Sequence, residues 1–257
     1  MRDPDSGWIQ LDAVELSALW STVDGDSPLV LDLPHVGRTE RDREELAGWV
    51  SWRLRERDLG TLDQPARDLA GFLRTLSEFD VSLDLRVDGT GEPLAAIAAD
   101  GRRGAAAAAR VGDEIRIGPV TPGRLVAQLL DSLAPLPAGP GRPANVSAAD
   151  FAEACQEGGR DGVSGFRQVL ADAGLRQPEI ATLGTALAGR TAVGKLGANN
   201  RGGRDGTVAR LPGMITWVDT PEGRYTLRRN ASWITVTPVD LPRLTAMAEE
   251  LLADARS

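Results

Sequence analysis

The sequence has very few of the residues that carry redox, metal and proton-transfer chemistry. Among its 257 residues there is one cysteine, Cys155, and one histidine, His35. A single thiol excludes an internal disulfide and a multi-thiolate metal site, and it fits a reducing compartment. A lone histidine far from the cysteine gives no support to a metal cage or a Ser-His-Asp set. We therefore predict no cofactor, no metal and no enzyme activity.

The sequence also lacks long apolar runs and an excess of positive charge. Runs such as Gly104 to Ala109 are far shorter than the roughly 20 residues that cross a bilayer. There are 29 basic and 37 acidic residues, a net charge of −8 and a pI near 4.9. This field repels phosphate backbones and anionic lipid, so we expect no nucleic acid and no membrane insertion. The first residues, Met1 to Asp5, do not resemble a secretory signal, which predicts a cytoplasmic protein.

Hydrophobic periodicity predicts a helical entry followed by an antiparallel meander. Helices are expected at Leu11 to Trp20, Thr39 to Asp58 and Gln64 to Ser77, with a short strand at Leu29 to Leu33. Four strands are expected at Val81 to Val87, Leu94 to Ala99, Gly104 to Arg110 and Glu114 to Ile117. The turn at Asp88 to Gly91 is a hairpin signal. A helix with Thr121 as its N-cap and Pro122 at its first position then closes this half.

The second half repeats the order of helices and strands. Helices are expected at Ser147 to Cys155, Phe166 to Ala173 and Glu179 to Ala188. Strands are expected from Thr191 to Val193 onward and at Gly213 to Thr220, Arg224 to Arg229 and Ser232 to Thr237. The segment Gly197 to Gly206 is rich in glycine and asparagine, which predicts a mobile loop.

A shift of the chain on itself by 119 positions reveals an internal repeat. It places Ile115 on Ile234, Pro119 on Pro238, Arg124 on Arg243 and Leu125 on Leu244, with Thr121 and Asp240 sharing an N-cap position. We predict an α/β (α+β) fold with a pseudo-two-fold repeat of a mainly antiparallel β-meander plus closing helix. The sheets are expected to pair or pack centrally, with helices covering one side. One domain, 1–257, would contain halves 1–137 and 145–257 joined by a Pro/Gly-rich connector.

Catalytic motifs match incompletely. Gly189 to Lys195 has the spacing of a phosphate-binding loop, but Leu196 stands where a hydroxyl would hold magnesium, so we interpret it as a loop-to-strand junction. Cys155 is predicted to be a buried or half-buried helix thiol, and His35 a loop residue. The carboxylate pairs Asp80/Asp84 and Asp219/Glu222 are interpreted as solvated turn residues, and Arg102-Arg103 and Arg228-Arg229 as solvated faces.

Several short segments, in order along the chain, carry a family resemblance. They are Glu15 to Trp20, Pro28 to Leu31, Gly37 to Arg41, Ser82 to Arg86, Gly223 to Tyr225 and Trp233 to Pro238. With these segments the chain resembles the EspG family, cytosolic specificity chaperones of ESX (type VII) secretion. The family's pseudo-two-fold α/β architecture agrees with the internal repeat.

The resemblance implies a function. Members bind PE/PPE-type secretion substrates at the helical tip of the PPE partner, keep them soluble and direct them to their own secretion system. Arginine-rich, lysine-poor composition suggests a high-GC actinobacterium, so a WXG-type substrate of another lineage is the other partner considered. A monomer or weak homodimer is expected.

For the binding face we favour the second meander, where large apolar groups stand on strands with cations at the rim. The predicted partner-binding residues are Ile215, Trp217, Arg224, Tyr225, Leu227 and Arg229. Because alternate strand residues face the core, each aromatic residue among them has packing as its competing interpretation. The Asp88 to Gly91 turn and the Gly197 to Gly206 segment are second candidates.

Two other functions remain open at this point. A pseudo-symmetric body commonly forms a cleft between its halves, so the chain could be a small-molecule-binding α/β protein or an enzyme. A deep pocket with several perturbed titratable groups would favour that interpretation, and a shallow apolar groove would favour the chaperone. A structural oligomerisation module would instead show a large isologous apolar interface.

Overall fold

A ten-stranded antiparallel sheet runs through the computed structural model, which describes residues 2–23, 25, 27–202 and 206–257. The first half supplies β1 (Ile9–Asp12), β2 (Val81–Gly89), β3 (Leu94–Gly101), β4 (Gly104–Val111) and β5 (Glu114–Val120). The second half supplies β6 (Ala144–Ser147), β7 (Ala192–Gly202), β8 (Thr207–Thr220), β9 (Gly223–Arg229) and β10 (Trp233–Pro238). The predicted mainly antiparallel α+β fold is confirmed.

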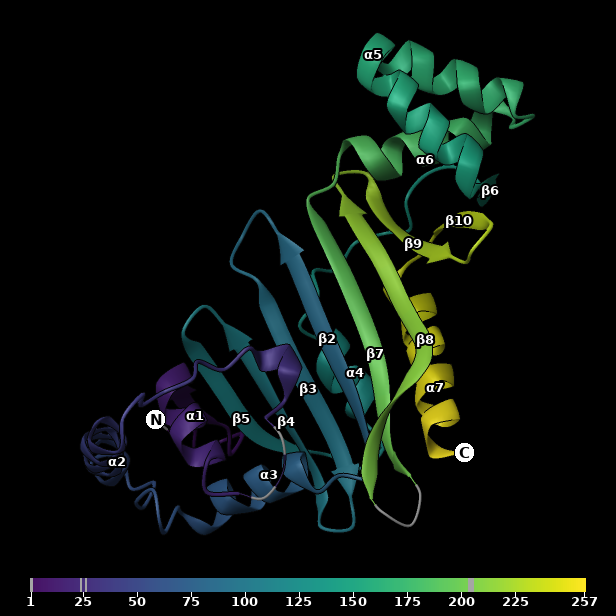
Figure 1. Ribbon diagram of the computed structural model, residues 1–257. Coiled ribbons are helices and arrows are strands. Elements are labelled where there is room, and N and C mark those ends of the chain that lie inside the picture. The colour runs from purple at the N-terminus through teal and green to yellow at the C-terminus, as the bar shows by residue number, and fades with distance from the viewer. Residues whose placement is uncertain (1, 24, 26, 203–205) are drawn as a thin grey trace.

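The strand order is β1-β5-β4-β3-β2-β7-β8-β9-β10-β6 (Figure 1). The halves meet at the β2–β7 pair, so the predicted central pairing is present. β5 and β10 each lie fourth from this centre, and each leads into a closing helix. The strand order is therefore compatible with the predicted repeat, while the two-fold superposition of the halves stays a prediction.

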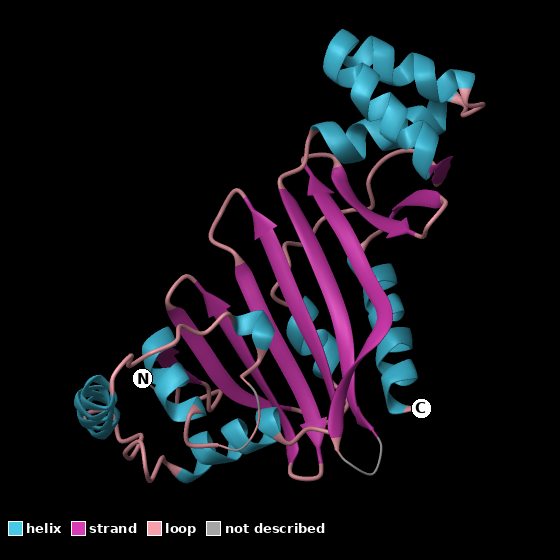
Figure 2. Ribbon diagram, viewed as in Figure 1, coloured by secondary structure: helices cyan, strands magenta, loops and turns pink. Residues whose placement is uncertain are grey.

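Helices cover both faces of the sheet, so the prediction that they pack on one side is wrong. They are α1 (Ala13–Trp20), η1 (Leu29–Leu31), α2 (Glu40–Arg55), α3 (Arg67–Ser77), α4 (Leu125–Leu130), α5 (Ala148–Asp172), α6 (Gln177–Ala188) and α7 (Leu241–Arg256). α4 and α7 share one apolar cluster behind the central strands. α1 to α3 and α5 to α6 pack in two other clusters, at opposite ends of the sheet (Figure 2). Alternation along β3 separates the faces: Ile97 belongs to the α1–α3 cluster and Ala98 to the α4–α7 cluster.

Side-chain caps set several helix starts. Asp12 accepts a hydrogen bond from the Glu15 backbone N–H, and the Glu15 carboxylate accepts one from the Asp12 N–H, a complete capping box for α1. Thr39 forms a second capping box with Asp42 at the start of α2. Asp240 accepts a hydrogen bond from the Arg243 N–H at the start of α7, so its predicted N-cap role is confirmed. The predicted Thr121 cap is wrong: α4 begins four residues later, at Leu125, without a side-chain cap.

The predicted strand at Leu29 to Leu33 is also wrong. The structure has the short 3₁₀ helix η1 there, followed by Asp32 in a left-handed conformation at φ 46°. The carbonyls of Leu31 and Asp32 accept hydrogen bonds from the Arg110 guanidinium instead of a neighbouring strand. A side chain from β4 therefore satisfies the backbone that a ladder would otherwise have used.

The segment predicted as a mobile loop, Gly197 to Gly206, is largely strand. β7 continues to Gly202, and its residues pair with β2 on one side and β8 on the other. Residues 203–205 lie outside the described residues. Neighbouring strands on both sides satisfy the backbone here, so pairing overrides the loop preference of glycine and asparagine.

The helices predicted at Ser147 to Cys155 and Phe166 to Ala173 are present as two helical segments under the single label α5, separated at Gly162. Gly162 has φ 66° and ψ −151°, a conformation that breaks the helical path and that glycine adopts without strain. No helix among the described residues is both long and apolar enough to cross a membrane.

Trp217 fills the back of the sheet at its centre. Its side chain is fully buried, and it lies flat across Gly194 on the neighbouring strand. A Cβ at Gly194 would stand 2.0 Å from two indole carbons. The missing side chain at Gly194 is therefore what admits the large ring between β7 and α7.

Arg224 is buried on the same side and fastens the connector to the sheet. Its Nε and Nη2 donate to the two Asp219 carboxylate oxygens at 2.6 and 3.0 Å, and Nη2 also donates to the Ala134 carbonyl. Its backbone N–H donates to the Pro137 carbonyl. Asp219, predicted to be a solvated turn residue, is only 6% exposed, so that interpretation is wrong.

Gly194→Ala should destabilise the protein by about 1–3 kcal/mol, because the new methyl group forces the buried Trp217 ring out of place. Urea unfolding followed by far-UV circular dichroism measures this change. The matched control is Gly71→Ala in α3, where a Cβ meets no atom within 4 Å and stability should rise by about 0.5–1 kcal/mol. Equal unfolding midpoints for the two variants would contradict the packing argument.

Asp219→Ala should cost about 3–5 kcal/mol, because it leaves the Arg224 guanidinium buried without its counter-ion. The double variant Asp219→Ala/Arg224→Met removes the unpaired charge and should recover most of that loss. Thermal and urea unfolding of both variants would test this. A double variant no more stable than Asp219→Ala would show that the ion pair is not the source of the effect.

Candidate functional site

The middle of the sheet is uncovered on one side. We call this surface the open face: the side of β2, β7 and β8 that points away from α7, between the α1–α3 end and the α5–α6 end (Figure 1). Strand register places on it the polar set of β2 and the matching residues of β7 and β8. These are Ser82, Asp84, Arg86, Lys195, Gly197, Asn199, Arg210, Met214 and Thr216.

A polar network crosses three strands at the centre of the open face. Arg210 donates from Nη1 and Nη2 to the two oxygens of Asp84, at 2.5 and 3.0 Å. Asn199 donates to the same carboxylate and to the Ser82 hydroxyl. The hydrogen bond to Asp84 raises the pKa of Arg210, which stays cationic at every physiological pH. Asp84, predicted to be solvated, is instead ion-paired with a side chain only 15% exposed.

The local backbone builds this network. The register of β7 against β8 shifts between Gly197 and Asn199, so that Arg210 lies opposite Asn199 and Met214 opposite Gly197. Arg210 then reaches across Gly197 to Asp84. A Cβ at Gly197 would stand 2.0 Å from an Arg210 nitrogen, so glycine provides the slot in which the guanidinium lies.

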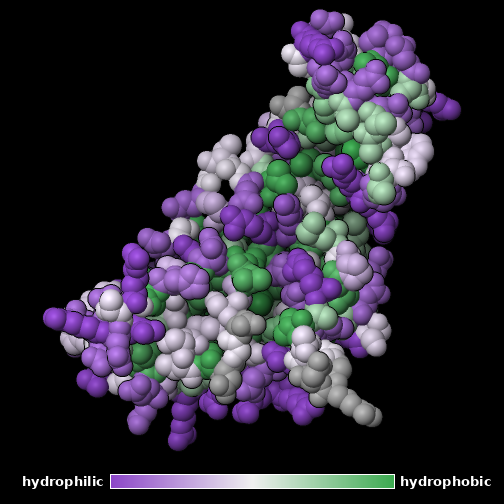
Figure 3. Space-filling model, in the orientation of Figure 1, coloured by the Kyte–Doolittle hydropathy of each residue, from purple (hydrophilic) through white to green (hydrophobic). Residues whose placement is uncertain are grey.

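Apolar side chains border this polar centre. η1 lies against β2 and β3 and holds Leu29 with 94% of its surface exposed. Met214 and Val208, both on β8, are about half exposed on the open face itself. Figure 3 shows green apolar patches in the middle of this side and beside the helical end, with purple polar side chains between them. The surface therefore combines scattered apolar groups with a charged centre.

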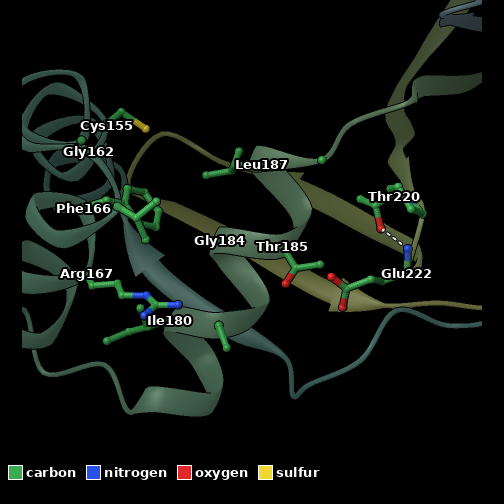
Figure 4. Close-up of a pocket in the computed structure, with 15 residues that line it drawn as sticks. Cys155, Gly162, Phe166, Arg167, Ile180, Gly184, Thr185, Leu187, Thr220 and Glu222 are labelled. Atoms are coloured by element: carbon green, nitrogen blue, oxygen red, sulfur yellow. Dashed lines mark hydrogen bonds between the residues drawn. The ribbon is translucent and has the colours of Figure 1, made fainter.

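A second recess lies at the α5–α6 end. The groove between α5, α6 and the β8–β9 turn has a volume of about 750 Å³. We call it the lobe groove. Small residues of both helices line it, including Gly158, Gly162 and Gly184, together with Phe166 and the exposed Val163. In Figure 4 the side chains of Phe166 and Arg167 extend from α5 toward α6.

The chemistry of the lobe groove is that of a binding surface. Cys155 lines it and is exposed, so the prediction of a buried or half-buried thiol is wrong. Partial desolvation raises the pKa of this thiol, which keeps it protonated and weakly nucleophilic at neutral pH. The described residues contain no group of three or more His, Cys, Asp or Glu side chains placed to hold a metal ion.

The six residues predicted to bind a partner fall mainly in the interior. Ile215 and Trp217 pack in the α4–α7 cluster, and Tyr225 packs in the α5–α6 cluster with its hydroxyl on the Pro140 carbonyl. Arg224 holds Asp219, as described above.

Leu227 is half-buried, and Arg229 is exposed. The other four residues are buried and contribute to packing inside the protein. Contact with a partner stays a prediction for all six.

The residues of the open face were not found from the sequence. The alternation of Ser82, Asp84, Arg86 and Asp88 was visible as the polar side of β2, but it did not show that this side lies between two helical ends. Arg210 had no signal, because its position opposite Asp84 depends on the irregular β7–β8 register. The lobe groove had one signal in the sequence: the glycines of the 158–165 segment, Gly158, Gly159, Gly162 and Gly165, favour a break in the helix there.

Comparison with known proteins gives three results. No curated protein matches the chain. A solved structure of the Mycobacterium tuberculosis type VII secretion system chaperone EspG5, in complex with a PE25–PPE41 dimer, is 18% identical in sequence, with a TM-score of 0.67. The alignment covers 96% of each chain, and it shows a shared fold. The sequence pattern of the EspG family matches residues 12–250, nearly the whole chain, and the protein therefore belongs to the EspG family.

Proposed function

We propose that this protein is a cytosolic chaperone of type VII (ESX) secretion. It binds a PE/PPE-type substrate at the helical tip of the PPE partner, keeps the pair soluble and directs it to the secretion system. EspG family membership over residues 12–250 is the observation that carries the proposal. The structural relative EspG5 is a chaperone solved with a PE25–PPE41 dimer, which supports the same substrate class.

The geometry supports a helical partner. The lobe groove is lined largely by glycine and other small residues, which let another backbone approach closely. The open face adds a flat, partly apolar surface with polar groups at its centre. Helix-in-groove recognition needs this combination of apolar contacts and a polar frame. The tip of a helical hairpin, resting on the open face and inserting side chains into the lobe groove, fits both surfaces.

We propose binding rather than catalysis as the role of these surfaces. In the lobe groove the raised pKa of the Cys155 thiol opposes a nucleophilic role. On the open face Asp84 is held by Arg210 and Asn199, so its carboxylate is engaged in structure and is not placed as a general base. We therefore interpret Asp84 and Arg210 as part of a contact surface.

We also propose that the two halves work as one domain. β2 and β7 pair along their whole shared length, from Val81 opposite Asn200 to Gly89 opposite Ala192. The open face takes residues from both halves, since Asp84 comes from one and Arg210 from the other. Neither half alone would present this surface.

Co-expression with a PE/PPE-like pair encoded in the same genome tests the proposal. The expected result is co-elution of all three chains in size-exclusion chromatography, with the pair insoluble or aggregated when expressed without this protein. The apolar tip of the pair explains that difference, because the chaperone covers it. Separate elution from every such pair in the genome would contradict the proposed function.

Val163→Asp should weaken binding of the pair about tenfold, because it places a carboxylate on an apolar wall of the lobe groove. Val163 is 64% exposed, so the substitution should leave folding intact. Dilution of the purified three-chain complex, followed by mass photometry, measures the affinity without requiring the free pair in bulk. Val111→Asp is the matched control: the same substitution at an exposed position on β4, at the other end of the sheet, should change the affinity less than twofold. Equal effects of both variants would remove the lobe groove from the interface.

A further inference from the structure

We propose that the centre of the open face is a carboxylate-binding site, formed by Arg86, Lys195 and Arg210, which receives an Asp or Glu side chain from the helical tip of the substrate. The inference rests on the proposed chaperone function and names the chemistry of its central contact. Two independent features of the described residues carry it: a cross-strand pair of cations in which Lys195 has no counter-ion, and a guanidinium with one edge free.

The like-charge pair joins β2 and β7. Arg86 and Lys195 are direct cross-strand partners, so their side chains leave the sheet next to each other on the open face. Two cations in this position repel each other and destabilise the strand pair. Arg86 donates to Asp88, but Lys195 has no hydrogen bond or ion pair with any residue that the structure describes. A carboxylate from a bound partner would relieve this repulsion.

Lys195 is the only lysine of the chain, and it stands exposed at the middle of this face. The protein carries a net charge of −8, so a cationic centre is a local departure from the overall field. The two carboxylates nearest along β2, Asp84 and Asp88, are each held by an arginine. With these two carboxylates neutralised by Arg86 and Arg210, the charge of Lys195 makes the centre of the open face net positive.

The free guanidinium edge belongs to Arg210. Asp84 occupies the end formed by Nη1 and Nη2, and Nη1 also reaches the Asn199 amide oxygen at 3.4 Å. Among the described residues nothing accepts from Nε, which with Nη2 forms the second edge of the planar fork. Arginine binds carboxylates through either edge with two parallel hydrogen bonds. With a side chain 49% exposed, Arg210 can hold Asp84 through one edge and a partner's carboxylate through the other.

The site is preorganised. The guanidinium lies in the slot above Gly197, and Asp84 itself is fixed by Asn199. Binding therefore costs little side-chain entropy at Arg210, unlike binding to a freely rotating surface arginine. Val208 and Met214 lie on β8 on either side of Arg210. They would exclude water from the contact, and the lower local dielectric would strengthen a charge-assisted hydrogen bond.

The test measures the affinity for a co-purifying PE/PPE-type pair by dilution of the purified three-chain complex, followed by mass photometry at 50 and 500 mM NaCl. Lys195→Glu should weaken binding about tenfold or more at low salt, because it replaces attraction by repulsion. The affinity of the unchanged protein should fall as salt rises, and that of Lys195→Glu should depend on salt much less. Arg210→Lys keeps the charge but loses the fork, and should also weaken binding about tenfold.

Two controls separate the contact from folding and from net charge. Lys195→Glu stands opposite Arg86 and forms an opposite-charge pair, so its melting temperature should be unchanged or higher by about 1–2 °C. Arg243→Glu makes the same charge change at an exposed position of α7, behind the sheet, and should leave the affinity within twofold.

A charge exchange completes the test. Each Asp and Glu of the substrate tip is replaced by Lys in turn, and one of these replacements should restore binding to the Lys195→Glu protein. If the unchanged protein binds no pair at all, the proposed function itself fails. If it binds a pair and Lys195→Glu binds that pair with equal affinity and the same salt dependence, the carboxylate site is overturned while the chaperone function stands.

Discussion

The pairing of β2 with β7 is the interaction on which the rest of the structure depends. Without it, each half of the chain would end in a long unpaired edge, and such edges pair with other chains. With it, ten strands form one sheet, and the edges of β2 and β7 pair with each other instead of with another chain. The same pairing brings the polar side of β2 next to that of β7, so the centre of the open face exists only because the halves meet there.

Helix placement explains why that centre is open. α4 and α7 follow β5 and β10, and both return to the back of the sheet, where Trp217 and Leu83 belong to one cluster. The other large helices pack at the two ends of the opposite side. A sheet face left bare between two helical ends tolerates water when its residues are polar, and the open face is mainly polar. Its isolated apolar groups, such as Leu29 and Met214, are then available to a partner.

Buried charge at the back of the sheet contrasts with exposed charge at the front. Arg224 and Asp219 are almost completely removed from water and fasten the connector, so changing one partner alone is costly. Arg210 and Asp84 make a similar bidentate pair, but the guanidinium is half exposed and keeps one edge for another acceptor. The same ion-pair chemistry therefore serves packing on one face and recognition on the other, and solvent access separates the two.

Local patterns in the sequence determined much of this protein. Alternation predicted β2 because strand residues face opposite sides in turn, and turn residues such as Asp100-Gly101 and Gly112-Asp113 separated the strands that follow. Asp240 predicted a helix start because its side chain satisfies a free backbone N–H group.

Tertiary structure decided the rest. Leu29 to Leu31 form a 3₁₀ helix whose end is held by Arg110 through the Leu31 and Asp32 carbonyls. The glycine-rich end of β7 became strand because it has neighbours on both sides. The packing of helices distant in the sequence decided which face of each strand remained exposed. Large apolar residues such as Trp217 and Tyr225 were therefore assigned to a binding face that the fold uses as its core. Periodicity is a local property, whereas burial depends on contacts between residues far apart in the chain.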